Sequence, residues 1–259
     1  MQLNGRHVVV TGAARGIGAA LARRFHADGA NVVVADVLPT EETVGPLERA
    51  IGVRADVSTE AGNVALIEAA EDAFGPIDLF FANAGIGGGT ALDTPEPEWE
   101  RAFAINVHAH RWAAKHLVPG WLARGEGYFC STASAAGVLA QIGSAPYTMT
   151  KRAAVAFAEW LSITYGDAGI RVSCLCPQGV NTDMLRAGDG LGGGTDVVRA
   201  AGNVLEPDDV AGVVADAIAQ ERFLILPHPE VHGYMVRKAE DPDRWLRGMR
   251  SLQRRVIGT

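Results

Sequence analysis

The sequence has little cysteine. Its 259 residues include three cysteines, Cys130, Cys174 and Cys176. A small, odd number in a chain of this length does not suggest the disulfide framework of a small secreted domain. Cys174 and Cys176 stand two residues apart in an apolar run, so on a strand they share a face and are best interpreted as buried small side chains. No other ligands stand at matching spacing, so we expect no metal site.

The sequence also lacks long apolar runs and an excess of basic residues. No stretch approaches the roughly 18 uninterrupted apolar residues typical of a membrane-spanning helix, and the N-terminus does not have the pattern of a signal peptide. The formal net charge is −7, without a basic stripe, which argues against a nucleic-acid partner. We therefore expect a cytoplasmic protein that binds neither a membrane nor nucleic acid.

What the sequence does contain is a regular alternation of two patterns. Short β-branched or apolar runs predict strands, and longer stretches with helical spacing lie between them. The all-valine runs at 8–10 and 32–34 indicate strands buried on both faces. This alternation predicts an α/β fold in one domain over residues 1–259, with a parallel sheet covered by helices on both faces. The predicted strands are 7–10, 31–35, 77–82, 128–131, 171–175 and 223–226, and the predicted helices include 17–27 and 61–74.

Two segments break the alternation. Residues 186–196 are rich in glycine and polar side chains, which predicts a mobile loop able to close over a substrate. Residues 228–259 are charged and predict a C-terminal helical appendage. His228 and His232 stand near prolines and are interpreted as surface residues. The appendage is expected to pack through side chains at helical spacing: Tyr234, Trp245, Leu246, Met249 and Leu252.

A glycine-rich turn follows the first predicted strand and opens the first predicted helix. Residues 11–18 read Thr-Gly-Ala-Ala-Arg-Gly-Ile-Gly. Such a turn lets the backbone approach a pyrophosphate, and the helix N-terminus offers free N–H groups to its phosphates. The alternative is a tight turn without a ligand. The predicted nucleotide-binding residues here are Gly12, Arg15, Gly16, Ile17 and Gly18.

Asp36 ends the second predicted strand. A carboxylate at this place accepts hydrogen bonds from the adenosine ribose hydroxyls and repels a 2′-phosphate, so it favours NAD over NADP. Arg15 is the opposing observation, because a basic side chain in the glycine turn suits a 2′-phosphate. We give Asp36 the greater weight, because the repulsion between its carboxylate and a 2′-phosphate should exceed the attraction that a flexible arginine supplies. The structural alternative is that Asp36 caps the strand end.

Tyr147 and Lys151 stand four residues apart, which places both on one face of a helix. A nearby cation favours the phenolate and lowers the pKa of a tyrosine, so the pair can exchange a proton with an alcohol or ketone. Ser134 precedes them, just beyond a predicted strand, and its hydroxyl suits the same substrate oxygen. Ser131 and Thr132 are alternatives for this role.

Together these features resemble the short-chain dehydrogenase/reductase family in order and spacing, over about residues 5–226. The resemblance rests on the turn at 11–18, Asn83-Ala84-Gly85, Asn106, Ser134, Tyr147 and Lys151. It implies a doubly wound Rossmann-type fold that binds its cofactor at the carboxyl ends of the strands. It also implies that Tyr147 is the general acid/base, that Lys151 lowers its pKa and holds the nicotinamide ribose, and that Ser134 orients the substrate.

The resemblance implies further cofactor contacts. Asp56 and Val57 match a pair that meets adenine, and Asn83, Ala84 and Gly85 match a segment that supports the adenosine half. Pro177, Val180 and Thr182 belong to a segment that meets the nicotinamide carboxamide and phosphate. Asn106 would hold a water through which protons reach Lys151; the alternative is that it bonds to backbone at a helix irregularity.

Two departures from the family pattern are visible. Gln178 replaces a glycine after a predicted strand, where it either reaches toward substrate or faces solvent. The charged C-terminal segment replaces the usual ending, which puts the common tetramer interface in doubt. We expect a homodimer or homotetramer, with pairing through long helices near 98–118 and 145–166.

The expected function is NAD(H)-dependent hydride transfer between nicotinamide and an apolar secondary alcohol or ketone. The first alternative is an NADP-dependent carbonyl or 3-ketoacyl reductase. The others are a dinucleotide sensor without turnover and a scaffold that acts through its C-terminal segment. Substrate contacts are expected from Val138, Leu139, Ile142, Gln178, Met184 and Leu185.

Overall fold

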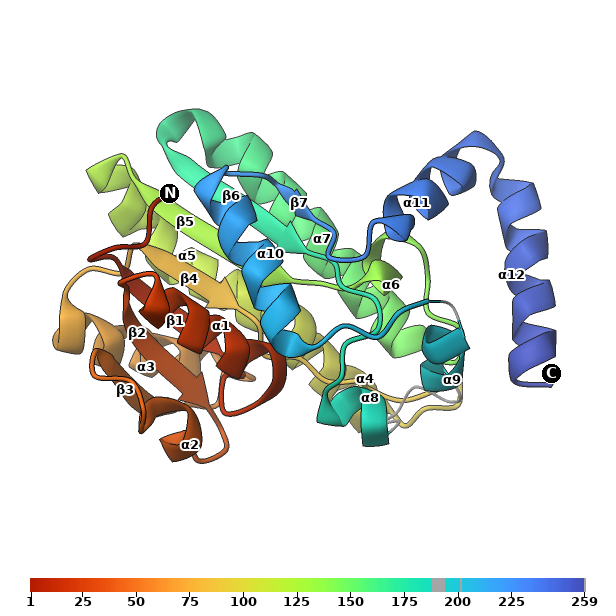
Figure 1. Ribbon diagram of the computed structural model, residues 1–259, viewed down its shortest axis with the longest axis horizontal. Helices are drawn as coiled ribbons and strands as arrows, with labels where there is room; N and C mark the ends of the chain where they lie inside the picture. The colour runs from red at the N-terminus through yellow and green to blue at the C-terminus, as the bar shows by residue number, and fades with distance from the viewer. Residues whose placement is uncertain (188–193, 201, 259) are drawn as a thin grey trace.

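The computed structural model describes residues 1–187, 194–200 and 202–258. Within them, seven parallel strands form one sheet in the order β3-β2-β1-β4-β5-β6-β7 (Figure 1). The predicted doubly wound sheet is therefore confirmed. The strands are β1 (His7–Thr11), β2 (Asn31–Asp36), β3 (Ala50–Arg54), β4 (Leu79–Ala82), β5 (Gly127–Thr132), β6 (Ile170–Leu175) and β7 (Leu224–Ile225).

Helices cover both faces of the sheet (Figure 1). The longer ones are α1 (Gly16–Ala27), α3 (Glu60–Phe74), α5 (Ala109–Arg124), α7 (Ala145–Tyr165), α10 (Pro207–Ala219), α11 (Glu230–Glu240) and α12 (Pro242–Val256). The shorter ones are α2 (Glu41–Val44), α4 (Glu96–Phe103), the π-helix η1 (Ala104–His108), α6 (Ala135–Val138), the 3₁₀ turn η2 (Gly166–Ala168), α8 (Asp183–Ala187) and α9 (Gly194–Ala200).

The valine run of β1 explains the two-sided core. Successive side chains of a strand point to opposite faces. Val8 and Val10 pack into a core with residues of α1 and α10, whereas Val9 packs into a second core with residues of α3, α5 and α7. All three valines are fully buried, as expected for a strand inside a parallel sheet covered on both faces.

The sheet order places a ligand site at the ends of β1 and β4. The chain runs outward from β1 through β2 to β3 and then crosses back to β4, which pairs with the other side of β1. Ligands of such sheets bind at the carboxyl ends of the strands where the order reverses. The glycine turn follows β1, and Asn83 follows β4, so both predicted segments meet at this point.

All six predicted strands are present with ends shifted by at most two residues, but β3 was missed. This strand lies at the edge of the sheet and pairs only with β2 among the described strands. Its five residues are half-buried or exposed and include Gly52 and Arg54. An edge strand needs no continuous apolar run, so it lacks the signal that identified the others.

The glycine-rich segment differs from its prediction where it is described. Arg186 and Ala187 belong to α8, and residues 194–196 begin α9, so these parts are helical rather than loop. Residues 188–193 lie outside the described part of the chain. None of the described helices has both the length and the apolar composition needed to cross a membrane.

Candidate functional site

One large cavity of about 880 Å³ opens at the carboxyl ends of the central strands. Its lining combines the glycine turn after β1, the segments after β4, β5 and β6, and part of the C-terminal helices. Its volume is in the range of pockets that hold small molecules and cofactors, roughly 300–1,000 Å³. All the predicted site residues line it except Asn106 and Val138.

The glycine turn is shaped to bring backbone against a ligand. Gly12 and Gly16 have φ values of +62° and +58°, a left-handed conformation that favours glycine. A Cβ atom at Gly12 would lie 2.7 Å from Ala84 Cα, so only glycine fits between the turn and the segment after β4. Helix α1 then begins at Gly16. Its N-terminal end lines the cavity through Gly16, Ile17 and Gly18. This arrangement suits the pyrophosphate of a dinucleotide.

Asp36 lies at the end of β2, and its carboxylate accepts hydrogen bonds from two nearby backbone N–H groups. Its Oδ2 accepts from Ala14 N and its Oδ1 from Leu38 N, both at 3.0 Å. The capping alternative is therefore present in the structure. It does not displace the ribose interpretation, because a carboxylate has further lone pairs and Asp36 lines the cavity beside Asp56 and Val57.

Asn83 joins the ends of three strands. Its Nδ2 donates to Thr11 O at 3.0 Å and Gly12 O at 3.2 Å, and its Oδ1 accepts from Thr132 Oγ1 at 3.0 Å. Thr11 Oγ1 in turn accepts from the backbone N–H groups of Asn83 and Ala84. The sequence interpretation missed these structural roles of Thr11 and Thr132, since a threonine at a strand end has no distinctive pattern.

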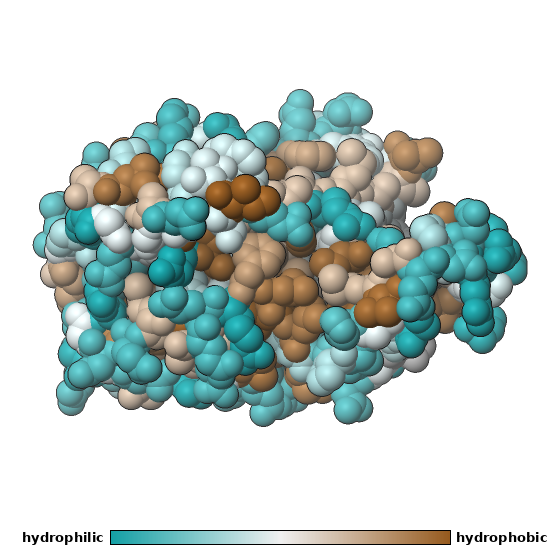
Figure 2. Space-filling model, turned by 90° about the horizontal axis from the view of Figure 1, so that it is seen from above, coloured by the Kyte–Doolittle hydropathy of each residue, from teal (hydrophilic) through white to brown (hydrophobic). Residues whose placement is uncertain are grey.

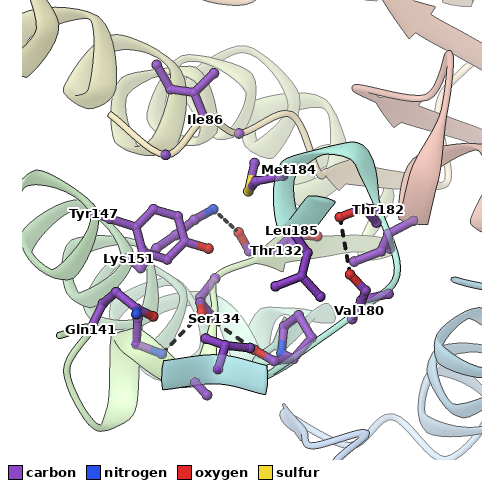
Figure 3. Close-up of a pocket in the computed structure, with 18 of the residues that line it drawn as sticks. Ile86, Thr132, Ser134, Gln141, Tyr147, Lys151, Val180, Thr182, Met184 and Leu185 are labelled. Atoms are coloured by element: carbon purple, nitrogen blue, oxygen red, sulfur yellow. Dashed lines mark hydrogen bonds between the residues drawn. The ribbon is translucent and has the colours of Figure 1, made fainter. Parts of the chain in front are cut away.

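Tyr147, Lys151 and Ser134 meet on one side of the cavity (Figure 3). Tyr147 lies in the first turn of α7, capped by Ser144, whose hydroxyl accepts from Tyr147 N. Ser134 caps α6 by accepting from Ala136 N at 3.1 Å. Lys151 is one turn beyond Tyr147, with its Nζ 5.7 Å from the centre of the Tyr147 ring, and it is 3% exposed.

The alternatives to Ser134 are occupied elsewhere. Ser131 is fully buried, its Oγ bonded to His110 Nδ1 at 2.8 Å, and it is absent from the described cavity lining. Thr132 donates its hydroxyl to Asn83, while its carbonyl accepts from Lys151 Nζ at 3.0 Å. Ser134 is therefore the hydroxyl best placed beside Tyr147.

The pKa of Tyr147 differs from the sequence expectation. Burial raises it, and the hydroxyl of Ser134 acts in the opposite direction. Burial also lowers the pKa of Lys151 to about 8. This side chain therefore loses part of its positive charge in the pH range in which it was expected to stabilise the phenolate. Desolvation disfavours both charged forms at once, which is why the expected lowering of the Tyr147 pKa by Lys151 is replaced by a rise.

Asn106 lies behind this group, in the π-helix η1. Its Oδ1 accepts from Ile86 N at 2.9 Å, and its Nδ2 donates to Ile86 O and Thr150 Oγ1 at 3.0 Å. A single π-turn inside a longer helix often marks a functional region. The side chain therefore bonds to backbone at a helix irregularity, which was the structural alternative for this residue. Its role in proton transfer stays a prediction.

The turn after β6 is fastened by a histidine. His228 is 2% exposed; its Nδ1 accepts from Gln178 N at 3.1 Å, and its Nε2 lies 3.0 Å from Gly179 O. The interpretation of His228 as a surface residue is therefore wrong, because the two free backbone groups of this turn draw the ring inward. His232 is exposed, as expected. Gln178 lines the cavity, with its Oε1 buried and unpartnered among the described residues.

The outer half of the cavity is apolar. Met184 and Leu185, from α8, face Tyr147 and Ser134 across it (Figure 3), and Ile142 contributes to the same wall. Val138 does not line the cavity; it is buried, and its carbonyl accepts from Lys238 of α11 at 2.9 Å. Its side chain packs into the hydrophobic core instead, so a contact between Val138 and substrate stays a prediction without support from the cavity lining.

The C-terminal helices complete the outer wall. Tyr234, Trp245, Met249 and Leu252 line the cavity as the helical spacing suggested. Leu246 was expected to pack with them but is 52% exposed, since it stands on the other side of α12. Arg237 and Arg255 also line the cavity. The sequence interpretation missed them because nothing in an arginine-rich helix tells which arginines face a pocket. The described residues contain no cluster of potential metal ligands.

Comparisons with known proteins agree with this geometry. Residues 6–189 match the family model described as short chain dehydrogenase. A 1-deoxy-11-beta-hydroxypentalenate dehydrogenase from Streptomyces exfoliatus is 36% identical over 243 residues, which cover 89% of this chain and 86% of that protein.

Two solved structures resemble the fold closely. A short-chain dehydrogenase/reductase from Burkholderia phymatum in complex with NAD has a TM-score of 0.86 and 31% identity, covering 94% of this chain and 96% of the other. A 7 alpha-hydroxysteroid dehydrogenase complexed with NADH and 7-oxo glycochenodeoxycholic acid has a TM-score of 0.79 and 25% identity, covering 87% and 93%. With this fold, these motifs and these relatives, the chain belongs to the short-chain dehydrogenase/reductase family of oxidoreductases.

Proposed function

We propose that this protein moves a hydride between NAD(H) and a secondary alcohol or ketone on an apolar skeleton. The observation that carries the proposal is the convergence of Ser134, Tyr147 and Lys151 on one wall of a cavity whose other half has the form of a nucleotide site. The relatives named above carry dehydrogenase in their names, and two of the names refer to a hydroxypentalenate and to a hydroxysteroid.

The nucleotide half of the cavity fits a dinucleotide. Gly12 approaches Ala84 too closely for any side chain, and this exposed backbone would bind the phosphates. Asp36 and Asp56, which line the cavity, would hold the ribose and the adenine. Lys151 would hold the second ribose, while Val180 and Thr182 would hold the nicotinamide end. A bound nicotinamide supplies the hydride acceptor or donor.

The protein's own residues manage the substrate and its proton. Ser134 and Tyr147 would bind the substrate oxygen between them. In the oxidative direction the Tyr147 phenolate takes the hydroxyl proton, and in the reductive direction the phenol returns it to the carbonyl oxygen. The apolar wall formed by Met184 and Leu185 would exclude water from this proton transfer.

The preference for NAD over NADP rests on two carboxylates. Asp36 places a negative charge where a 2′-phosphate would lie. Arg15, the residue that favours NADP, is engaged by Asp183, with Arg15 Nη1 2.7 Å from Asp183 Oδ2. The alternative, an NADP-dependent carbonyl or 3-ketoacyl reductase, requires that Arg15 leave this ion pair.

Self-association through the long helices remains part of the proposal. Helix α7 exposes Met149, Trp160 and Ile163, the last of them 85% accessible. Large apolar side chains on one exposed helix commonly mark a protein interface. Sedimentation of the purified protein distinguishes a monomer from a homodimer or homotetramer.

The first experiment is a fluorescence titration with NADH and NADPH, followed by a screen of apolar secondary alcohols with NAD. We expect tighter binding of NADH, and we expect Tyr147→Phe to keep that affinity while losing about a thousandfold or more in turnover. Tyr165→Phe, at the far end of α7, is the matched control. Binding without turnover by the parent protein would favour the sensor alternative, and unchanged turnover in Tyr147→Phe would refute the mechanism.

A further inference from the structure

We propose that the C-terminal helices α11 and α12 select substrates that carry an anionic group, with Arg237 or Arg255 binding a carboxylate remote from the reacting hydroxyl. The inference rests on the proposed function, because it assigns the substrate class of the same site.

The two helices project from the body of the protein (Figure 1), and residues of both line the cavity. Helix α11 is fastened to the segment behind Ser134, where Lys238 Nζ donates to Val138 O at 2.9 Å and Leu139 O at 2.6 Å. Helix α12 then runs alongside α9. The helices are thereby attached to the segment that follows Ser134, and they line the outer end of the cavity.

The inward side of α12 is apolar. Trp245, Met249 and Leu252 follow helical spacing, are partly buried and line the cavity. The Tyr234 ring of α11 lies 6.2 Å from the Trp245 ring, which extends the same wall. Figure 2 shows apolar side chains gathered on the face between the body and the projecting segment, whose outer surface is hydrophilic. An apolar skeleton of some length would be covered along this wall.

The charge at this end of the cavity is positive. Helix α12 contains one acidic residue, Asp243, and five arginines, in a chain whose net charge is −7. The acidic residues in the described lining are Asp36, Asp56 and Asp183. The first two lie in the nucleotide half, and Asp183 is paired with Arg15 and Arg186. The outer end therefore has arginine without neighbouring carboxylate in the described lining.

Arg237 and Arg255 are the two tail arginines of that lining. The Arg237 guanidinium lies 4.9 Å from the centre of the Tyr234 ring, an arrangement that orients its plane while leaving its N–H edge available. Neither arginine forms an ion pair within residues 1–187, 194–200 and 202–258. The planar N–H donors of either arginine suit a carboxylate.

The substrate that fits all three observations has a hydroxyl or ketone at one end, an apolar skeleton and an anion at the other end. Ser134 and Tyr147 would bind the first, the wall of α11 and α12 would cover the second, and Arg237 or Arg255 would bind the third. A short neutral alcohol would leave both the wall and the arginines unused.

The test compares hydroxy acids with their uncharged methyl esters. The probes are lithocholate and a fatty acid with a hydroxyl near its methyl end, each assayed with NAD for kcat/KM and by calorimetric binding to the NADH-loaded protein. We expect the acids to be preferred over the esters by roughly five- to tenfold, because the arginines are partly solvated, and we expect this preference to fall as salt is added.

Arg237→Gln combined with Arg255→Gln should abolish the preference for acid over ester in both assays. Arg247→Gln combined with Arg250→Gln is the matched control, because it removes the same charge from exposed positions of α12 outside the cavity lining. Equal use of acid and ester, binding of neither, or equal loss in both double variants would overturn the inference while leaving alcohol turnover intact. Failure of the proposed function would instead appear as no turnover of any alcohol.

Discussion

The Arg15 guanidinium lies against the Asp183 carboxylate, with Arg15 Nη1 2.7 Å from Asp183 Oδ2. This ion pair joins the glycine turn after β1 to helix α8, and both segments line the cavity. Both side chains are largely exposed, so the pair adds little to stability. Its consequence is chemical, because it pairs the one basic side chain of the turn with Asp183, and the proposed preference for NAD depends on both Arg15 and Asp36.

Removing the two carboxylates should therefore change the cofactor preference stepwise. Asp36→Asn removes the charge that repels a 2′-phosphate, and adding Asp183→Asn releases Arg15. We expect each step to shift the ratio of NADPH to NADH affinity toward NADPH by roughly tenfold, about 1.4 kcal/mol. Fluorescence titration with both nucleotides measures the ratio.

Asp208→Asn is the control for this series, since Asp208 forms a similar exposed ion pair with Arg23 at 2.9 Å but does not line the cavity in the described structure. A double variant that still prefers NADH as strongly as the parent would show that neither carboxylate determines the choice.

The pH dependence of turnover should follow Tyr147. Burial raises the pKa of its phenol, and the Ser134 hydroxyl opposes that rise. The phenolate needed for oxidation thus forms only as the pH increases, so oxidation should accelerate with pH and reduction should slow. Ser134→Ala should lower kcat by about a hundredfold and move the oxidation profile to higher pH. A profile that moves to lower pH, or does not move, would contradict the assignment of Ser134.

Acid should destabilise the fold through His110. This ring is fully buried beside Ser131, and burial lowers its pKa from 6.5 to about 3. The folded ring stays neutral between these values while the unfolded one gains a proton, so stability falls as the pH drops below 6.5. At pH 5 the expected loss is about 2 kcal/mol relative to neutral pH.

Urea unfolding at pH 7 and pH 5 measures this loss. In His110→Gln the difference in free energy of unfolding between pH 7 and pH 5 should shrink by that amount, whatever the variant's stability at pH 7. His232→Gln, at an exposed position, should keep the parent's difference. Equal differences in all three proteins would mean that His110 does not carry the acid sensitivity.

The sequence predicted those parts of the site that depend on local order along the chain. Gly12 and Gly16 need left-handed backbone just after a strand, and Tyr147 and Lys151 need only one helical turn to face the same way. Such requirements leave a readable pattern. Asp36 was likewise identifiable, because it ends an apolar strand.

The parts that the sequence did not predict depend on distant partners. His228 is buried because the turn at Gln178 offers it a donor and an acceptor fifty residues earlier in the chain. The rise in the Tyr147 pKa follows from burial by several elements together. Val138 and Lys238 are a hundred residues apart, and their contact depends on where α11 folds back.

The contact between Lys238 and Val138 should position the C-terminal helices. Lys238 Nζ donates to two carbonyl groups just behind Ser134, so Lys238→Met should loosen the C-terminal helices and leave the two carbonyls without this donor. The local cost is about 1–3 kcal/mol. We expect the KM of an apolar alcohol to rise several-fold and α12 to become sensitive to limited proteolysis, while the Kd of NADH stays unchanged because the nucleotide half is at the other end of the cavity.

Two further variants separate positioning from general instability. Lys238→Arg keeps a charged donor and should restore most of the KM, whereas Arg244→Met removes a charge from an exposed position of α12 outside the cavity lining and should leave it unaffected. If Lys238→Met weakens NADH binding in parallel with substrate, the residue supports the whole fold rather than the substrate wall. If neither the KM of the alcohol nor the Kd of NADH changes, the C-terminal helices hold their position by packing alone, through Tyr234 and Trp245.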